Sequence, residues 1–153
     1  MKKILTLCVI HKNDQVLLGF KKKGFGAGRW NGFGGKVEDG ETIEEAARRE
    51  VFEEAGVVVK DIGKVGTMEF SFKDKPEVLE VHLFRASDFD GEPVEGEEMR
   101  PKWFHVDELP FDKMWPDDKY WYPLFLENKK FDGKFFFKDL DSLIEYKLVP
   151  LES

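Results

Sequence analysis

Between Gly34 and Val57 the chain reads GGKVEDGETIEEAARREVFEEAGV, in which a glycine loop leads into an acidic segment. Thr42 is suited to cap the start of a helix, and Glu45 three residues later can complete a capping box. Gly56 suits the left-handed conformation that ends many helices. The sequence therefore predicts a glycine loop followed by a helix that lies between these two caps.

Three glutamates of this segment recur at helical spacing. Glu50, Glu53 and Glu54 stand at i, i+3 and i+4, so their side chains gather within roughly a 100° arc. Ile43 and Ala47 point the same way, which puts the carboxylates at the edge of the face expected to pack. Like charges this close repel, and carboxylate oxygens suit a hard divalent cation, Mg²⁺ or Mn²⁺. The spacing favours a metal-binding helix.

The simplest alternative is an amphipathic surface helix whose glutamates are solvated. The order of the residues favours another interpretation. Gly35, then Glu41 after five residues, then Arg49–Val57 after seven more, resembles the Nudix box throughout. A pattern that fixes so many positions across a loop, a helix and a second loop is highly specific. Membership of the Nudix hydrolase family is therefore expected.

Composition limits the class of protein and its partners. The 153 residues suit one domain with a real core, and 41% are hydrophobic while 36% are charged. The net charge of −7 argues against polymeric nucleic acid, because proteins that bind polyanions are usually basic. Cys8 is the only cysteine, which fits a reducing compartment and a buried small residue. We expect a cytoplasmic protein without a membrane span.

Alternating apolar residues predict a largely β-sheet protein, of class α+β. The run after Trp115–Pro116 is expected to form a second helix that reaches about Asn128. Residues 107–110 read as a short helical turn, and 88–98 as an acidic loop. The expected strands are 4–11 and 15–22 as a hairpin, 65–72 and 78–86 as an antiparallel pair, a short run from 57, and 100–105, 129–138 and 142–149.

Glycines and aromatic residues interleave between Lys21 and Lys36. A phosphate-binding P-loop is excluded because Lys36 is followed by Val37, and the glycine spacing does not match a dinucleotide-binding fingerprint. Glycines this dense indicate a backbone that bends sharply or lies close to a ligand. Phe25, Trp30 and Phe33 are suited to stack on a base or to fill the core. Asn31, taken alone, favours a turn residue over a ligand contact.

Adjacent carboxylates follow a tryptophan at Trp115–Asp118. Either aspartate is suited to cap the following helix. In an aromatic pocket, however, two neighbouring carboxyls cannot both ionise cheaply, so the pKa of one rises and that group stays neutral. Such a pair donates one hydrogen bond and accepts others, which suits a purine edge that carries a carbonyl and N–H groups. The stretch is thus either a helix cap or a base-reading site.

Four stretches of the sequence together resemble one group within the Nudix family more closely than the family at large. They resemble the oxidised-purine nucleoside triphosphate hydrolases, and the similarity covers essentially the whole chain. The resemblance implies one domain, 1–153, with a Nudix fold in which helices sandwich a mixed sheet. It implies hydrolysis of triphosphates such as 8-oxo-dGTP and 2-hydroxy-dATP to the monophosphate and pyrophosphate, which keeps damaged nucleotides out of DNA. The stretches are 25–37, 35–57, 98–101 and 115–118.

The resemblance also implies roles for individual residues. Mg²⁺, with Mn²⁺ as a substitute, would be held by Gly34, Glu50, Glu53, Glu54 and Glu98. Catalysis would rest on the same three helix glutamates and on Arg49, which would orient them, and the sequence leaves the general base unassigned. The substrate site would comprise Thr6, Lys21, Phe25, Asn31, Phe33, Gly34, Gly35, Lys36, Phe70, Phe72, Trp115, Pro116, Asp117 and Asp118.

Three rival functions differ from this expectation. A Nudix hydrolase of ADP-ribose or a dinucleoside polyphosphate would keep the helix but not the Trp115–Asp118 pocket. A catalytically silent nucleotide-binding module would usually lack one of the box glutamates, and all are present. An interaction domain has no motif in its favour. Leu79 stands where the pattern commonly carries methionine, which bears on base preference. We expect a monomer that binds small nucleotides.

Overall fold

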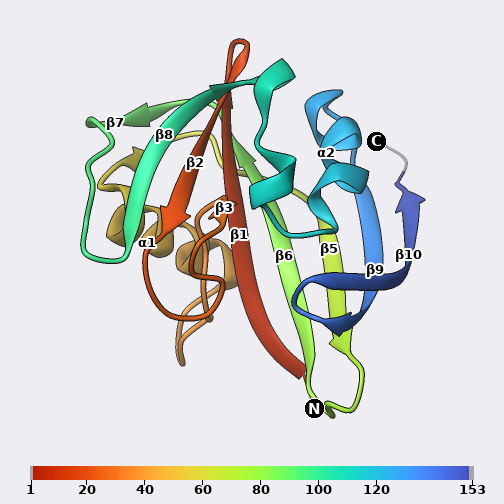
Figure 1. The fold of residues 1–153 in the computed structure, drawn as a ribbon. Helices are drawn as coiled ribbons and strands as arrows, with labels where there is room; N and C mark the ends of the chain where they lie inside the picture. The colour runs from red at the N-terminus through yellow and green to blue at the C-terminus, as the bar shows by residue number, and fades with distance from the viewer. Residues whose placement is uncertain (1, 152–153) are drawn as a thin grey trace.

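The computed structural model describes residues 2–151 of the chain. Its central element is a mixed β-sheet (Figure 1). Within these residues the sheet has eight strands, and β8 (Met99–His105) pairs with β2 outside the main path. The order along that path is β10 (Ser142–Pro150), β9 (Phe131–Asp139), β5 (Gly63–Phe72), β6 (Val78–Ala86), β1 (Lys2–Lys12), β2 (Gln15–Lys21) and β3 (Trp30–Asn31).

Both parallel and antiparallel pairs occur in this sheet. β1 runs parallel to β6 and β5 runs parallel to β9, while the remaining pairs are antiparallel. The expected hairpins 4–11 with 15–22 and 65–72 with 78–86 are confirmed. Asn13 adopts a left-handed φ of 56° in the first hairpin turn, a conformation that asparagine tolerates.

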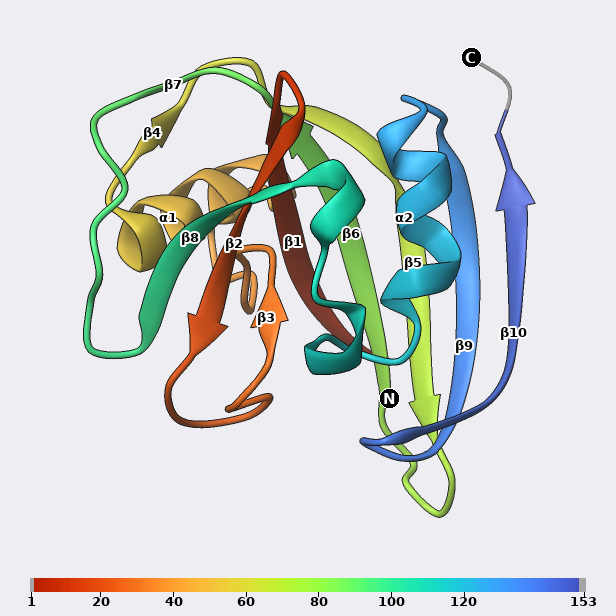
Figure 2. The same cartoon turned by 45° about the horizontal axis from the view of Figure 1, so that its top comes forward.

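Two helices cover opposite faces of the sheet (Figure 2). Residues alternate along β1, so Leu7 and Val9 face one way while Cys8 and Ile10 face the other. Helix α1 (Ile43–Ala55) packs on the side of Cys8, and helix α2 (Asp118–Leu126) packs on the side of Leu7. This arrangement confirms the expected α+β class and the sandwich of helices around a mixed sheet.

Both predicted caps of α1 are present. The Glu45 N–H donates to Thr42 Oγ1 across 3.1 Å, and the Thr42 N–H donates to Glu45 Oε1 across 2.8 Å. Gly56 adopts φ 75° at the other end, and its N–H donates to the Phe52 carbonyl. The helix therefore begins and ends where the local sequence predicts, which fixes the direction of its glutamates.

The remaining elements differ from the expectations only locally. The acidic loop 88–98 contains a short strand, β7 (Phe89–Asp90), which pairs with β4 (Val58–Val59). The 3-10 helix η1 (Val106–Glu108) replaces the expected turn at 107–110, and η2 (Phe111–Lys113) follows it. Among residues 2–151, neither helix has the length and apolar character needed to span a membrane. The single domain 1–153 stays a prediction, and its ends at 1 and 152–153 lie outside the described residues.

Candidate active site

The glycine loop before α1 lies directly against β1. The Thr6 N–H donates to the Gly35 carbonyl across 2.8 Å, and the Cys8 N–H donates to the Phe33 carbonyl across 2.7 Å. A Cβ atom added at Gly34 would lie 1.8 Å from the Thr6 carbonyl oxygen. Any side chain at Gly34 would push the loop off the strand, so glycine is needed for this close approach.

The helix glutamates divide into a buried pair and an exposed member. Glu54 Oε1 accepts a hydrogen bond from the Gly34 N–H across 2.9 Å. The Glu50 carboxyl lies over Gly35, where an added Cβ would approach it to 2.7 Å. Burial, and then the neighbouring Glu50, raise the pKa of Glu54 to about 8, and burial also raises the pKa of Glu50. The Glu53 side chain is 54% exposed. The three glutamates therefore share one side of the helix, as the spacing predicts, but Glu53 is more exposed than the other two.

Arg49 connects these glutamates to the loop. Its guanidinium donates to both Glu41 oxygens, at 2.7 and 3.0 Å, and to the Lys36 carbonyl at 3.0 Å. It also donates to Glu50 across 2.7 Å and to Glu53 across 3.2 Å. These charge-assisted bonds raise the pKa of Arg49 and lower the pKa of Glu41. The fork of one arginine thereby fixes the rotamers of two helix carboxylates.

The donors at this end of the site fit a hard divalent cation. They are carboxylate and carbonyl oxygens, and Glu50 and Glu54 lie close together with pKa values that burial raises. Among residues 2–151, however, no three carboxylate, histidine or cysteine side chains converge to hold a metal by themselves. Oxygens from a bound phosphate would have to complete such a site. The ligand set Gly34, Glu50, Glu53, Glu54 and Glu98 stays a prediction.

Two further charged residues, Glu98 just before β8 and Lys21 at the end of β2, lie near the carboxylates of Glu50 and Glu54. Glu98 precedes β8 and is exposed, and its charge contributes to the raised pKa of Glu54. Lys21 ends β2 and lines the pocket, and its charge acts to lower the pKa of both Glu50 and Glu54. Lys21 thus places a cation in the pocket lining together with Glu54.

A pocket extends from Glu54 across the sheet to the start of α2. It brings together residues from the glycine loops, from β1, β2, β5 and β6, and from the Trp115–Asp118 turn. Most of the expected substrate residues line it. These are Thr6, Lys21, Phe25, Asn31, Gly34, Gly35, Phe70, Phe72, Trp115, Asp117 and Asp118.

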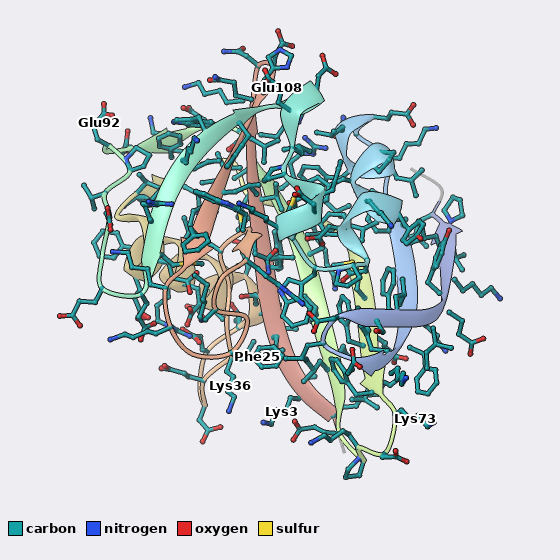
Figure 3. The ribbon with its side chains drawn as sticks, viewed as in Figure 1. Lys3, Phe25, Lys36, Lys73, Glu92 and Glu108 are labelled. Atoms are coloured by element: carbon teal, nitrogen blue, oxygen red, sulfur yellow. The ribbon has the colours of Figure 1, made fainter. Side chains whose placement is uncertain are left out.

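Three expected substrate residues, Phe33, Lys36 and Pro116, are not among the residues that line the pocket. The Phe33 side chain is fully buried on the α1 side of the sheet, because alternation about the loop turns it away. Lys36 is exposed and meets Arg49 through its backbone carbonyl. Pro116 is half-buried in the turn before α2. Phe25 and Lys36 come from the two loops that flank β3 (Figure 3).

The deep end of the pocket holds buried polar groups whose hydrogen bonds are incomplete. Asp117 and Asp118 are each 2% exposed, and Thr6 is 3% exposed. Thr6 Oγ1, Asp117 Oδ1 and Asp118 Oδ2 have no hydrogen-bond partner. Burial raises the pKa of Asp117 to about 6, and burial together with the adjacent Asp117 also raises the pKa of Asp118 well above its usual value. Unpaired buried polar atoms are costly, so these three atoms are available to a ligand.

The structure decides between the two interpretations of the aspartates. Asp117 occupies the position before α2 but its side chain makes no capping hydrogen bond. Its Oδ2 instead accepts from Trp121 Nε1 across 2.8 Å, one turn into the helix. The Asp117 side chain is therefore not a cap of α2, and both carboxyls line the pocket.

Trp115 forms an aromatic wall of the pocket. The Phe25 ring lies 5.3 Å from the Trp115 ring, and the Phe137 ring meets it edge-on at 6.4 Å. The Arg29 guanidinium lies 4.4 Å from the centre of the Trp115 ring. Sequence reasoning assigned no role to Arg29, although the residue stands within the quoted motif 25–37. The link between Arg29 and Trp115 exists only in the folded chain.

Comparison with known proteins agrees with this geometry. A family profile described as the NUDIX domain matches residues 1–125. The chain belongs to the Nudix hydrolase family. Its glycine loop and glutamate helix are the Nudix box, and Nudix hydrolases generally use a divalent metal ion. The family assignment confirms the expectation drawn from the box.

Individual relatives cover nearly the whole chain. An oxidized purine nucleoside triphosphate hydrolase from Mus musculus is 52% identical over 151 residues, 99% of this chain and 97% of that protein. The enzyme of that name from Danio rerio is also 52% identical, over 98% of this chain and 96% of its own. A crystal structure of a mutator MutT protein from Bacillus halodurans matches with a TM-score of 0.85 and 29% identity, over 95% of this chain and 97% of its own.

Proposed function

We propose that this Nudix hydrolase cleaves oxidised purine nucleoside triphosphates, such as 8-oxo-dGTP and 2-hydroxy-dATP, to the monophosphate and pyrophosphate. Two relatives named for that substrate class are 52% identical along nearly their whole length. The pocket supports the same substrate, because a deep polar end, an aromatic wall and a carboxylate mouth follow one another. These match the base edge, the base face and the phosphates of a nucleotide.

The aspartate pair is the observation that carries the proposal. Asp117 and Asp118 are buried side by side, each with a carboxyl oxygen that lacks a partner. Because two such groups cannot both ionise, the pair presents one carboxylate and one neutral acid. A purine edge that carries both N–H groups and a carbonyl can hydrogen-bond to the carboxylate through its N–H groups and to the neutral acid through its carbonyl. Oxidation changes the donors and acceptors of a purine, and a hydrogen-bonding site discriminates strongly among such edges.

Aromatic side chains supply the second part of base recognition. Trp115 provides a ring face beside the aspartates, and Phe70 and Phe72 line the pocket from β5. Phe70 is itself stacked on Phe135 at 5.1 Å, so its ring is held in place. Base stacking on aromatic rings is worth about 1–3 kcal/mol per base.

The phosphates would lie at the carboxylate end. Mg²⁺, or Mn²⁺ in its place, would be held there by Glu50, Glu53, Glu54 and the Gly34 carbonyl, with Glu98 nearby. When bound, the ion supplies neutralisation of phosphate charge and a lower pKa of water. Lys21 adds a positive charge to the pocket lining near Glu54. Arg49 holds Glu50 and Glu53 in position.

Cleavage is a hydrolysis within the α–β phosphate bridge. The oxygen of an attacking water forms a bond to phosphorus, the bridging P–O bond breaks, and pyrophosphate leaves. The proton of that water passes to a carboxylate of α1, which acts as general base. Glu54 is anchored by the Gly34 N–H at the mouth of the pocket, so its carboxyl is held for such a role.

The biological setting follows from the substrate. Removal of oxidised triphosphates sanitises the nucleotide pool and prevents their incorporation into DNA. We place the protein in the cytoplasm, where such nucleotides circulate. A net charge of −7 fits a monomer that takes up free nucleotides with a metal ion and not a polymer of nucleic acid.

One assay separates this function from its rivals. Pyrophosphate release with Mg²⁺ is measured on dGTP, dATP, 8-oxo-dGTP and 2-hydroxy-dATP, and phosphate-bond cleavage is measured on ADP-ribose and diadenosine tetraphosphate. The proposal expects the oxidised purines to give kcat/KM values at least tenfold above every other compound. Preferential cleavage of ADP-ribose or of the dinucleoside polyphosphate would assign the chain to another branch of the family.

A further inference from the structure

Arg29 lies on the loop between β2 and β3, and its side chain contacts both Trp115 and the turn between β9 and β10. Its guanidinium lies over the Trp115 ring at 4.4 Å. One terminal nitrogen donates to the Leu140 carbonyl across 2.8 Å, and the other forms an ion pair with Asp141. The Arg29 side chain is only 17% exposed, whereas its partner Asp141 is 85% exposed.

These contacts join parts of the chain that are distant in sequence. Leu140 and Asp141 form the turn between β9 and β10, and Trp115 precedes α2. The turn is itself held by the Asp141 N–H, which donates to Asp139 across 2.9 Å. Arg29 therefore clamps Trp115 between its own loop and the last hairpin of the sheet. A tryptophan held in this way keeps one ring plane, which stacking on a flat base requires.

The charge of Arg29 also acts on the deep end of the pocket. It lowers the pKa of both Asp117 and Asp118, in opposition to burial. Tyr122, fully buried on α2, also faces the pair, and burial together with Asp118 and Asp117 raises the pKa of its hydroxyl. Asp141, on the far side of Arg29, is 85% exposed and partly offsets its charge. Arg29 is thus the cation that opposes full protonation of the aspartate pair.

We propose that Arg29, clamped by Asp141, is a positioning residue for base recognition: it fixes the plane of the Trp115 ring. This inference rests on the proposed function of the pocket. It predicts that purine affinity depends on a turn, 139–141, that does not line the pocket. Lysine would retain the charge but not the planar fork that spans the ring, Leu140 and Asp141.

The test compares Arg29→Lys, Arg29→Gln and Asp141→Asn with wild type. Arg48→Gln is the matched control, because Arg48 likewise donates to a carbonyl, Val59 at 2.8 Å, and pairs with a carboxylate, Glu44, but lies outside the pocket. Kinetic constants are measured for 8-oxo-dGTP between pH 5 and pH 9. Binding of 8-oxo-dGMP is measured by calorimetry in EDTA, which reports on the base site without metal or turnover.

Loss of the clamp is expected to weaken binding and spare the chemistry. Arg29→Gln should raise KM, and the Kd for 8-oxo-dGMP in EDTA, about tenfold with kcat within twofold. Asp141→Asn, at an exposed site that cannot disturb folding much, should raise both about threefold. Removal of the positive charge of Arg29 raises the pKa of the aspartates. The loss of 8-oxo-dGMP affinity at low pH should therefore begin at a higher pH in Arg29→Gln and at the wild-type pH in Arg29→Lys.

Other results would overturn the inference. Wild-type Kd values in Arg29→Gln and Asp141→Asn would show that the clamp does not position the base. Equal losses in Arg48→Gln would reduce the effect to general stability. A pH limb that moves equally in Arg29→Lys and Arg29→Gln would remove the role of the charge. Failure of the proposed function would look different, because wild type itself would then fail to prefer 8-oxo-dGTP over dGTP.

Discussion

Trp121 Nε1 donates a hydrogen bond to Asp117 Oδ2 across 2.8 Å, within α2 and one turn from its start. The bond holds one oxygen of Asp117 and leaves the other, Oδ1, directed at no partner. Asp118 is equally buried, and its Oδ2 is also unpaired. Two buried acidic groups thus stand at the start of a largely apolar helix, a placement that costs stability and that the proposed role in base recognition would explain.

That cost predicts a dependence of stability on pH. Burial raises the pKa of Asp117 to about 6, above its value near 4 in the unfolded chain. The protonated folded state is favoured, so this contribution to stability is complete below about pH 4 and is lost as pH rises through about 6. Asp117→Asn cannot ionise, and its free energy of unfolding relative to wild type should rise by roughly 2 kcal/mol from about pH 4 to about pH 7.

Urea unfolding at several pH values measures this difference. Asp112→Asn is the control, because Asp112 is exposed in η2, and its difference from wild type should stay constant over the same range. A constant difference for Asp117→Asn as well would show that the aspartate is not forced toward its neutral form by the fold.

The glutamate helix gives a prediction about chemistry alone. Glu54→Gln keeps an oxygen that can accept from the Gly34 N–H but removes the negative charge. We expect kcat to fall at least about a hundredfold, as for the loss of a general base or metal ligand, while 8-oxo-dGMP binding in EDTA stays unchanged. Glu44→Gln, in the exposed first turn of α1, should retain wild-type turnover. Near wild-type kcat in Glu54→Gln would refute the role of this helix.

Glu41 acts at one remove from the helix carboxylates, through Arg49. Glu41 accepts two bonds from Arg49, at 2.7 and 3.0 Å, and so directs the guanidinium toward Glu50. Glu41→Gln weakens this charge-assisted pair, and we expect kcat to fall about tenfold and the Mg²⁺ concentration for half-maximal activity to rise severalfold. Steady-state assays over a Mg²⁺ titration give both numbers. Unchanged metal dependence would mean that Glu41 does not support the carboxylates.

The helix α1 could be predicted from the sequence because its determinants are local. Thr42, Glu45 and Gly56 act within one turn of their own positions, and the spacing of Glu50 and Glu54 sets their common direction. Strand periodicity likewise predicted the main strands of the sheet, because alternation is a property of neighbouring residues. The short strands β4 and β7 hold each other by pairing, so β7 carries too little pattern of its own to be found.

The pocket could be predicted only in part, because burial depends on the tertiary packing. The sequence offered Phe33 equally as a base contact or as a core residue, and the sheet turns it into the core. Thr6 had the pattern of an ordinary strand residue, yet its hydroxyl faces the pocket unpaired. Arg29 reaches Asp141 across 112 positions, a contact that no local pattern encodes.

The central claim is that Asp117 and Asp118 read the edge of an oxidised purine, and specificity constants test it most directly. The kcat/KM values for 8-oxo-dGTP and 2-hydroxy-dATP are measured for wild type, Asp117→Asn and Asp118→Asn. Each substitution removes an ionisable group, so the account predicts a change of about tenfold or more in the ratio of the two constants. Equal losses on both substrates, with the ratio unchanged, would contradict it.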